Sequence, residues 1–187
     1  MAGRANEDQP GASRQKPAVD EAAYREAIAH FATGVTVITT NVDGEPAGMT
    51  ASAVASLSLA PVLLLVCIST HLRTHEALEN SGRFVVNVLG EEHEELARRF
   101  ARSQEGKFAE VRLDPSYELP VLADAIAHFI CDVKERIPGG DHSIFIGQVT
   151  ECTHVPGRKP LVYFKSSFGR IDDPDRAALE PYNIGAW

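Results

Sequence analysis

The residues whose types suggest chemistry most directly form a strip of small and hydroxyl-bearing side chains, "GMTASAVASLSLAP", at positions 48–61. Its hydroxyls belong to Thr50, Ser52, Ser56 and Ser58. Small side chains let a flat ligand approach the backbone, while amides and hydroxyls can hydrogen-bond its carbonyl and imide groups. The apolar run at 62–68 follows directly and would keep water away from such a ring. The strip therefore suits a planar, redox-active heteroaromatic ring, although the same composition could simply fill a tightly packed barrel corner.

A second group of polar residues follows the apolar run, in "CISTHLRTHEAL" at 67–78. Hydroxyls there lead into Arg73 and Thr74 at the expected start of a helix. Free backbone N–H groups at a helix N-terminus, together with a guanidinium, bind phosphate well. The segment therefore predicts a phosphate site, with an ordinary helix cap and a surface arginine as the alternative.

Histidines provide the remaining candidates. His142 in "GGDHSIFIGQV" stands at the first position of an expected strand, where it could contact a cofactor or substrate, although a lone histidine is more often structural. His71 and His75 are four residues apart, a spacing that could hold a metal. No further ligand completes a set nearby, so we expect an exposed helix surface there and no metal site.

Composition and missing motifs exclude several classes of protein. The net charge is −8 without a long basic block, which argues against nucleic-acid or anionic-membrane binding. There is no GxGxxG, GxxxxGK[ST] or GxSxG motif, and the longest apolar run is too short to span a bilayer. Cys67, Cys131 and Cys152 lack CxxC spacing, which indicates buried, reduced thiols. We expect a cytoplasmic protein.

Periodicity predicts the elements that must position these residues. A helix should open near Asp20, with Tyr24, Ile28 and Phe31 in one apolar stripe and Gly34 after its end. Two further helices are expected at 70–82 and 91–103, the second with acids in its first turn and arginines in its last. The flanking segments 1–19 and 172–187 are expected to be a disordered tail and an irregular extension with a helical turn at 175–180.

About seven strands are expected between and after these helices, at 35–40, 47–59, 62–68, 83–89, 126–137, 142–152 and 160–165. The first should be half-buried and the third buried on both faces. Asp43-Gly44 predicts a hairpin turn. Because most strands follow one another through turns, without intervening helices, we predict a mainly β protein with flanking helices, built as an antiparallel barrel.

Taken in order, "FATGVTVITT", "GMTASAVASLSLAP", "VLLLVCISTHLRTHEAL", "RFVVNVL", "FARSQEGKF", "GGDHSIFIGQV" and "PLVYFKSSFG" resemble a known family. This is the family of short-chain flavin reductases, which carry a flavin-reductase-like, FMN-binding split-barrel domain. They are the reductase components of two-component flavin-dependent monooxygenases. The resemblance covers residues 20–171, so it implies an antiparallel split β-barrel over most of the chain.

The resemblance also implies a role for individual residues. The flavin ring would lie along Pro46, Gly48, Met49, Thr50, Ser52 and Ala53. The ribityl chain would meet Cys67, Ile68 and Ser69, and the phosphate would meet Arg73 and Thr74. The residues closing over the flavin would be Phe100, Lys107 and Phe108. The nicotinamide would lie beside His142, opposite Tyr163, Phe168 and Gly169. The chain departs from many relatives at Ser52, where they carry Asn, at Val54, where they carry a large aromatic, and at Phe164-Lys165.

The implied activity is NAD(P)H:flavin oxidoreduction, in which hydride passes from NADH to FMN or FAD and the reduced flavin goes to a partner monooxygenase. A homodimer with its flavin sites near the interface is also implied. The sequence does not choose between FMN and FAD or between NADH and NADPH. A split-barrel enzyme that retains its flavin for another redox reaction, and a non-enzymatic carrier of flavin or heme, remain as alternatives.

Overall fold

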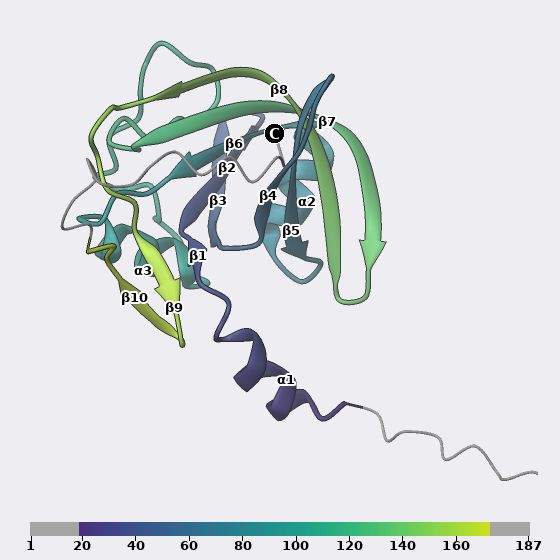
Figure 1. Ribbon diagram of the computed structural model, residues 1–187. Coiled ribbons are helices and arrows are strands. Elements are labelled where there is room, and N and C mark those ends of the chain that lie inside the picture. Colours follow the sequence, from purple (N-terminus) through teal and green to yellow (C-terminus); the bar gives the residue numbers. More distant parts are fainter. Residues whose placement is uncertain (1–18, 173–187) are drawn as a thin grey trace, which may run out of the picture.

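The computed structural model describes residues 19–172, whose centre is a seven-stranded sheet with the strand order β3-β2-β6-β7-β8-β5-β4 (Figure 1). The strands are β2 (Thr36–Val42), β3 (Glu45–Ala51), β4 (Val54–Leu59), β5 (Val62–Ser69), β6 (Arg83–Val88), β7 (Ala127–Gly139) and β8 (His142–His154). Every pairing is antiparallel. The two edge strands, β3 and β4, are joined only by Ser52 and Ala53, so the sheet has to curl until these edges approach each other. The predicted split β-barrel is confirmed.

A small second sheet lies beside the barrel. It contains β1 (Thr33–Gly34), β9 (Val162–Phe164) and β10 (Ser167–Gly169), in the order β1-β9-β10. Lys165 and Ser166 connect β9 to β10 with positive φ angles of 47° and 59°, as a tight two-residue hairpin turn requires. Figure 1 shows this hairpin next to α3 (Glu94–Ala101).

Of the three helices within residues 19–172, two pack against the barrel. In α2 (Arg73–Ser81), Leu78 is buried, and the helix ends at Gly82, whose φ of 66° permits the left-handed cap. In α3, Ala97 and Phe100 are buried, with acidic residues in the first turn and arginines in the last, as predicted. Both helices begin a few residues later than the sequence suggested. No helix within residues 19–172 is both long and apolar enough to cross a membrane.

The first helix, α1 (Glu21–Ile28), projects away from the barrel (Figure 1). The helix opens at Asp20 as predicted, and the Ala23 N–H donates to the Asp20 carboxylate over 3.1 Å as an N-cap bond. The helix ends at Ile28, well before Gly34. Its apolar stripe meets nothing in the described chain, since Tyr24 is 57% exposed and Phe31 is 71% exposed. An amphipathic helix without a partner in its own chain suggests an intermolecular contact.

Burial corrects the predictions for two strands. The threonines of β2 led us to expect a half-buried strand, but Thr36 through Thr40 are all buried. Ile38 packs with Leu78 of α2, whereas Val37 packs in the cluster that contains Phe100 of α3, so both faces are covered. The strand at 62–68 was expected to be buried on both faces, but it alternates between buried and half-buried residues. The strip at 47–59, expected as one strand, is β3 and β4.

The histidine and cysteine predictions are also corrected. His75 is buried in α2, and His71 precedes the helix, so the two do not share an exposed helix surface. Among residues 19–172, no three His, Cys, Asp or Glu side chains are grouped to bind a metal ion. Cys131 is a buried thiol, and burial raises its pKa to about 12, but Cys152 is exposed on β8. The expected tail and the helical turn at 175–180 lie outside the described residues, apart from residue 19 of the tail.

Gly147 of β8 lies in close packing with the neighbouring strands, and this packing yields a stability prediction. A Cβ atom at this position would lie 2.6 Å from Phe84 Cζ and 2.8 Å from Cys131 Cβ. We expect Gly147→Ala to lower the free energy of unfolding by about 1–3 kcal/mol through overpacking, measured by denaturant titration. Gly139→Ala is the control, because its Cβ would meet only ordinary contacts at 3.6 Å and beyond. Equal midpoints for the two variants would contradict this packing.

Candidate active site

A cleft of about 1370 Å³ opens between β3, the N-terminus of α2, the C-terminus of α3, the loop at 102–109 and the β9–β10 hairpin. This volume exceeds the roughly 300–1,000 Å³ of an ordinary small-molecule site, so the cleft has room for a large ligand or for two ligands side by side. Its walls come from segments spread along the described chain, which only the folded barrel brings together.

Most of the predicted site residues line this cleft. They are Pro46, Gly48, Met49, Thr50, Ser52, Arg73, Thr74, Phe100, Lys107, Phe108, Tyr163 and Phe168. The structure places six others outside its lining, namely Ala53, Cys67, Ile68, Ser69, His142 and Gly169. Ile68 is completely buried in the core, so only its backbone could face a ligand. The roles assigned to all of these residues stay predictions.

The small-residue strip divides into two parts with different surroundings. The β3 part forms the floor of the cleft, whereas Ser56 and Ser58 of β4 lie outside it. The Thr50 hydroxyl donates to the Ala97 carbonyl of α3 over 2.6 Å, so it anchors that helix to the floor. The exposed Ser52 hydroxyl is therefore the group of the strip best placed to donate to a ligand.

Gly48 accommodates an aromatic pair from the protein itself. A Cβ atom at Gly48 would lie 3.0 Å from Phe100 Cε1 and 3.1 Å from Phe108 Cζ. The two rings pack edge to face, with centroids 5.0 Å apart and an interplanar angle of 87°. The missing side chain at Gly48 thus lets an aromatic wall stand directly against the cleft floor.

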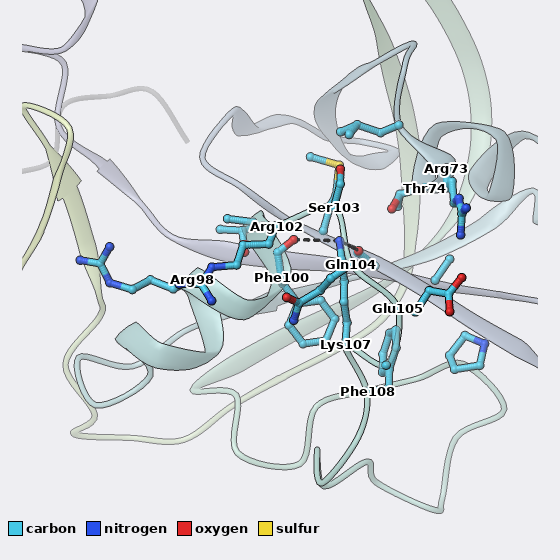
Figure 2. Close-up of a pocket in the computed structure, with 18 of the residues that line it drawn as sticks. Arg73, Thr74, Arg98, Phe100, Arg102, Ser103, Gln104, Glu105, Lys107 and Phe108 are labelled. Atoms are coloured by element: carbon cyan, nitrogen blue, oxygen red, sulfur yellow. Dashed lines mark hydrogen bonds between the residues drawn. The ribbon is translucent and has the colours of Figure 1, made fainter.

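Lys107 fastens the loop at 102–109 to this floor. Its Nζ donates to the carbonyl oxygen of Gly48 over 3.2 Å and to that of Phe100 over 3.1 Å (Figure 2). The Phe100 carbonyl lies at the C-terminal end of α3, where the helix dipole favours a positive charge. Burial lowers the pKa of the Lys107 ammonium. The cleft floor therefore carries a partly desolvated positive charge.

Positive side chains also mark the two ends of the cleft, as Figure 2 shows, with Arg73 and Thr74 at one end and Arg98 at the other. At the first end, Leu72 occupies the cap position of α2 without a side-chain hydrogen bond. The His75 N–H donates to the Leu72 carbonyl over 2.9 Å, so the N–H groups of Arg73 and Thr74 are the ones available for an anion. At the other end, the Arg98 guanidinium lies 4.9 Å from the Phe168 ring centroid. Phe168 packs in turn on Tyr163, with centroids 5.5 Å apart.

His142 lies just outside the cleft, beside the turn that leads into α2. It begins β8 as predicted and pairs with Ser69 of β5. Its Nδ1–H donates to the Asp141 carboxylate over 2.8 Å, and this bond holds the pKa of Asp141 below its usual value. The ring is fixed in place but remains 44% exposed, so it can meet a ligand that extends beyond the phosphate end of the cleft.

Sequence reasoning missed several polar residues that line the cleft. They are Glu45, His71, Arg98, Arg102, Ser103, Gln104 and Glu105. Most belong to the segment around Phe100 and Lys107, and the arginines there had been attributed only to the helix dipole. The sequence could have indicated these residues, because they lie close to Phe100 and Lys107, which were already predicted to be site residues. Tertiary packing, which brings this segment over β3, could not be read from local pattern.

The fold and the cleft together define a split-barrel flavin reductase. Residues 28–172 match the flavin reductase like domain, and the chain belongs to this family. Over 169 residues it is 40% identical to the reductase component of 4-nitrophenol 4-monooxygenase/4-nitrocatechol 2-monooxygenase of Rhodococcus opacus, covering 90% of this chain and 86% of that protein. It is 41% identical over 169 residues to flavin reductase (NADH) of Kitasatospora aureofaciens, covering 86% and 88%.

Among solved structures, the chain is similar to the NADH:FAD oxidoreductase SgcE6 of Streptomyces globisporus, solved in complex with NAD and FAD fragments. The TM-score is 0.78 at 36% identity, over 84% of this chain and 95% of that one. The residues of the cleft fit a flavin. The β3 floor offers small side chains and one exposed hydroxyl, and the uncapped α2 N-terminus with Arg73 offers an anion site.

The loop contact of Lys107 supplies a prediction for binding. Lys107→Met should remove the two bonds to β3 and α3 and free the loop, weakening flavin binding by about tenfold, the effect of one or two charge-assisted hydrogen bonds. Flavin fluorescence quenching measures this change. Lys134→Met is the matched control, since Lys134 is exposed on β7. Equal affinities in the two variants would contradict a role for Lys107 in shaping the cleft.

Proposed function

We propose that the protein oxidises NADH and reduces free FMN or FAD, which then leaves to serve a separate flavin-dependent monooxygenase. The observation that carries the proposal is the cleft, in which a small-residue floor, an aromatic wall and an anion site converge in a member of the flavin reductase family. The named activities of the relatives support NADH as the donor. Hydride transfer is chemistry that the two nucleotides supply themselves, whereas the protein aligns them.

Each part of the cleft has a role in this proposal. The floor at Gly48–Ser52 supports the flavin ring, with the Ser52 hydroxyl and backbone groups available to its polar edge. Arg73 and the first turn of α2 hold the flavin phosphate. The positive charge of Lys107 favours the negative charge that develops on the ring. Phe100 and Phe108 keep water from one side.

The nicotinamide nucleotide is proposed to lie along the cleft, from the β9–β10 hairpin at the Arg98 end toward His142 beyond the Arg73 end. Tyr163 and Phe168 offer an aromatic surface on the hairpin side. His142, held by Asp141, positions the nicotinamide nucleotide from the other side. No proton-transfer group is required in this step, because hydride passes directly between the two rings.

We also propose that the protein forms a homodimer. The α1 stripe is exposed, and so are the apolar residues Leu57, Leu59 and Val62 of the β4–β5 hairpin, at 44%, 61% and 46%. Contiguous exposed apolar side chains on a folded domain mark an interaction surface. We propose that a second copy of the chain, related by two-fold symmetry, covers these exposed residues. Sedimentation or light scattering measures this, and a monomer at micromolar concentration would contradict it.

The activity is tested by following NADH and NADPH absorbance with and without added FMN or FAD. We expect oxidation of NADH that requires free flavin and saturates with it, because flavin is a substrate. An enzyme that purifies yellow and ignores added flavin would favour a retained cofactor and another redox reaction. A flavin-binding protein that oxidises neither nucleotide would favour a carrier.

The role of His142 is tested by His142→Ala. We expect kcat/KM for NADH to fall by about tenfold while the dissociation constant for flavin changes by less than about twofold, because the side chain positions only the nicotinamide. His154→Ala is the control, since His154 is exposed at the other end of β8. Weakened flavin binding with unchanged turnover per bound flavin would show that the role is misassigned.

A further inference from the structure

A buried polar pair joins α2 to the start of β8. The Nε2 atom of His75 lies 2.8 Å from the Ser143 hydroxyl, and the two residues are only 6% and 3% exposed. Two polar side chains in an apolar core stabilise it only if they satisfy each other, and removal of either leaves the other unpaired at a cost. The proposed hydride transfer uses neither residue.

The His75 ring is held on its other sides as well. It packs edge to face on Phe145, with centroids 5.3 Å apart, and its Nδ1 lies 3.6 Å from the Glu79 carboxylate. Glu79 also forms an ion pair with Arg136. The Glu79 carboxylate favours the tautomer with the proton on Nδ1, in which Nε2 accepts the Ser143 O–H. The ring therefore has one orientation and bridges the helix to the sheet.

The order Ser143, His75, Glu79 has the sequence of groups found in a hydrolase triad, but this site has no access to a substrate. Ser143 is 3% exposed and lies outside the lining of the cleft. A nucleophile has to reach the atom it attacks. The pair can therefore act only through the position of its neighbours in the chain.

Those neighbours are the proposed phosphate and nicotinamide contacts. Arg73 and Thr74 directly precede His75, and His142 directly precedes Ser143. Hydrogen bonds also join the two segments at Asp141, on the other side of His142. The N–H and the hydroxyl of Thr70 both donate to the Asp141 carbonyl, over 3.0 and 3.1 Å. The turn into α2 is thus fastened to β8 at both residues that flank His142.

We infer that His75 is a positioning residue, which through Ser143 sets the first turn of α2 so that Arg73 and Thr74 face the phosphate of the flavin. This inference rests on the proposed function. It predicts that loss of the bond affects recognition of the phosphate group and leaves the contacts of the flavin ring with β3 unchanged. A ligand with the ring but without the phosphate separates the two contributions.

FMN and riboflavin are that pair of ligands, and fluorescence quenching of each by the full-length protein gives its dissociation constant. We expect His75→Leu and Ser143→Ala to weaken FMN binding by about fivefold to tenfold, the effect of one buried hydrogen bond, and to change riboflavin binding by less than about twofold. His75→Gln, whose amide can still bond Ser143, should restore most of the FMN affinity. Thermal unfolding verifies that each variant is folded.

Equal losses for FMN and riboflavin, or no rescue by His75→Gln, would show that the pair only stabilises the fold, and would overturn the inference. Unchanged FMN affinity in both His75→Leu and Ser143→Ala would overturn it as well. Arg73→Ala provides the reference for loss of the phosphate contact. If Arg73→Ala also leaves the ratio of the FMN and riboflavin dissociation constants unchanged, the phosphate does not bind at Arg73. That result would overturn the inference as well. Flavin-dependent NADH oxidation by the wild-type protein then reports separately whether the proposed function stands.

Discussion

The architecture depends on the two-residue connection between β3 and β4. These strands are neighbours in sequence but lie at opposite edges of the seven-stranded sheet, so Ser52 and Ala53 force the sheet to close on itself. Closure leaves β3 hydrogen-bonded to β2 on one side only. The other edge of β3 can form hydrogen bonds with groups outside the sheet. The Lys107 ammonium donates to the Gly48 carbonyl there, and a ligand can bind to the same edge. The cleft thus exists because the barrel is split at this point.

The cleft gathers positive charge in a protein with a net charge of −8. Arg73, Arg98, Arg102 and Lys107 face the cleft, against Glu45 and Glu105. An acidic surface with a local basic pocket selects small anionic ligands and disfavours nucleic acid. Phosphorylated flavins and nicotinamide nucleotides are small anionic ligands of this kind. The charge distribution therefore agrees with the reaction class that family membership indicates.

The sequence predicted what short-range chemistry determines. Asp43 and Gly44 adopt the positive φ angles that their turn requires, and Gly82 ends α2 where a left-handed cap is needed. Arg73, Thr74, Phe100 and Lys107 were placed at the site through the family resemblance, and the barrel brings them to one cleft. The turn and the cap are confirmed because each depended on a local motif. A run of motifs in a recognisable order placed the four cleft residues together, and their roles stay predictions.

The missed features depended on partners distant in sequence. The threonine hydroxyls of β2 led us to expect that one face of the strand is exposed to solvent. Instead, the Thr39 hydroxyl donates to the carbonyl of Pro120 over 2.7 Å, and the two residues are 81 positions apart in the sequence. His75 finds Ser143 in the same way, 68 residues further along the chain. The stripe of α1 has no partner within the described chain. A periodic pattern reveals that a face is apolar or polar, but not which element covers it.

A crystal structure of the protein with FMN tests the proposed flavin site most directly. We expect the isoalloxazine ring against Gly48–Ser52, with the phosphate at Arg73 and the first turn of α2. A flavin bound away from β3, or one whose phosphate points toward Arg98 instead, would contradict it.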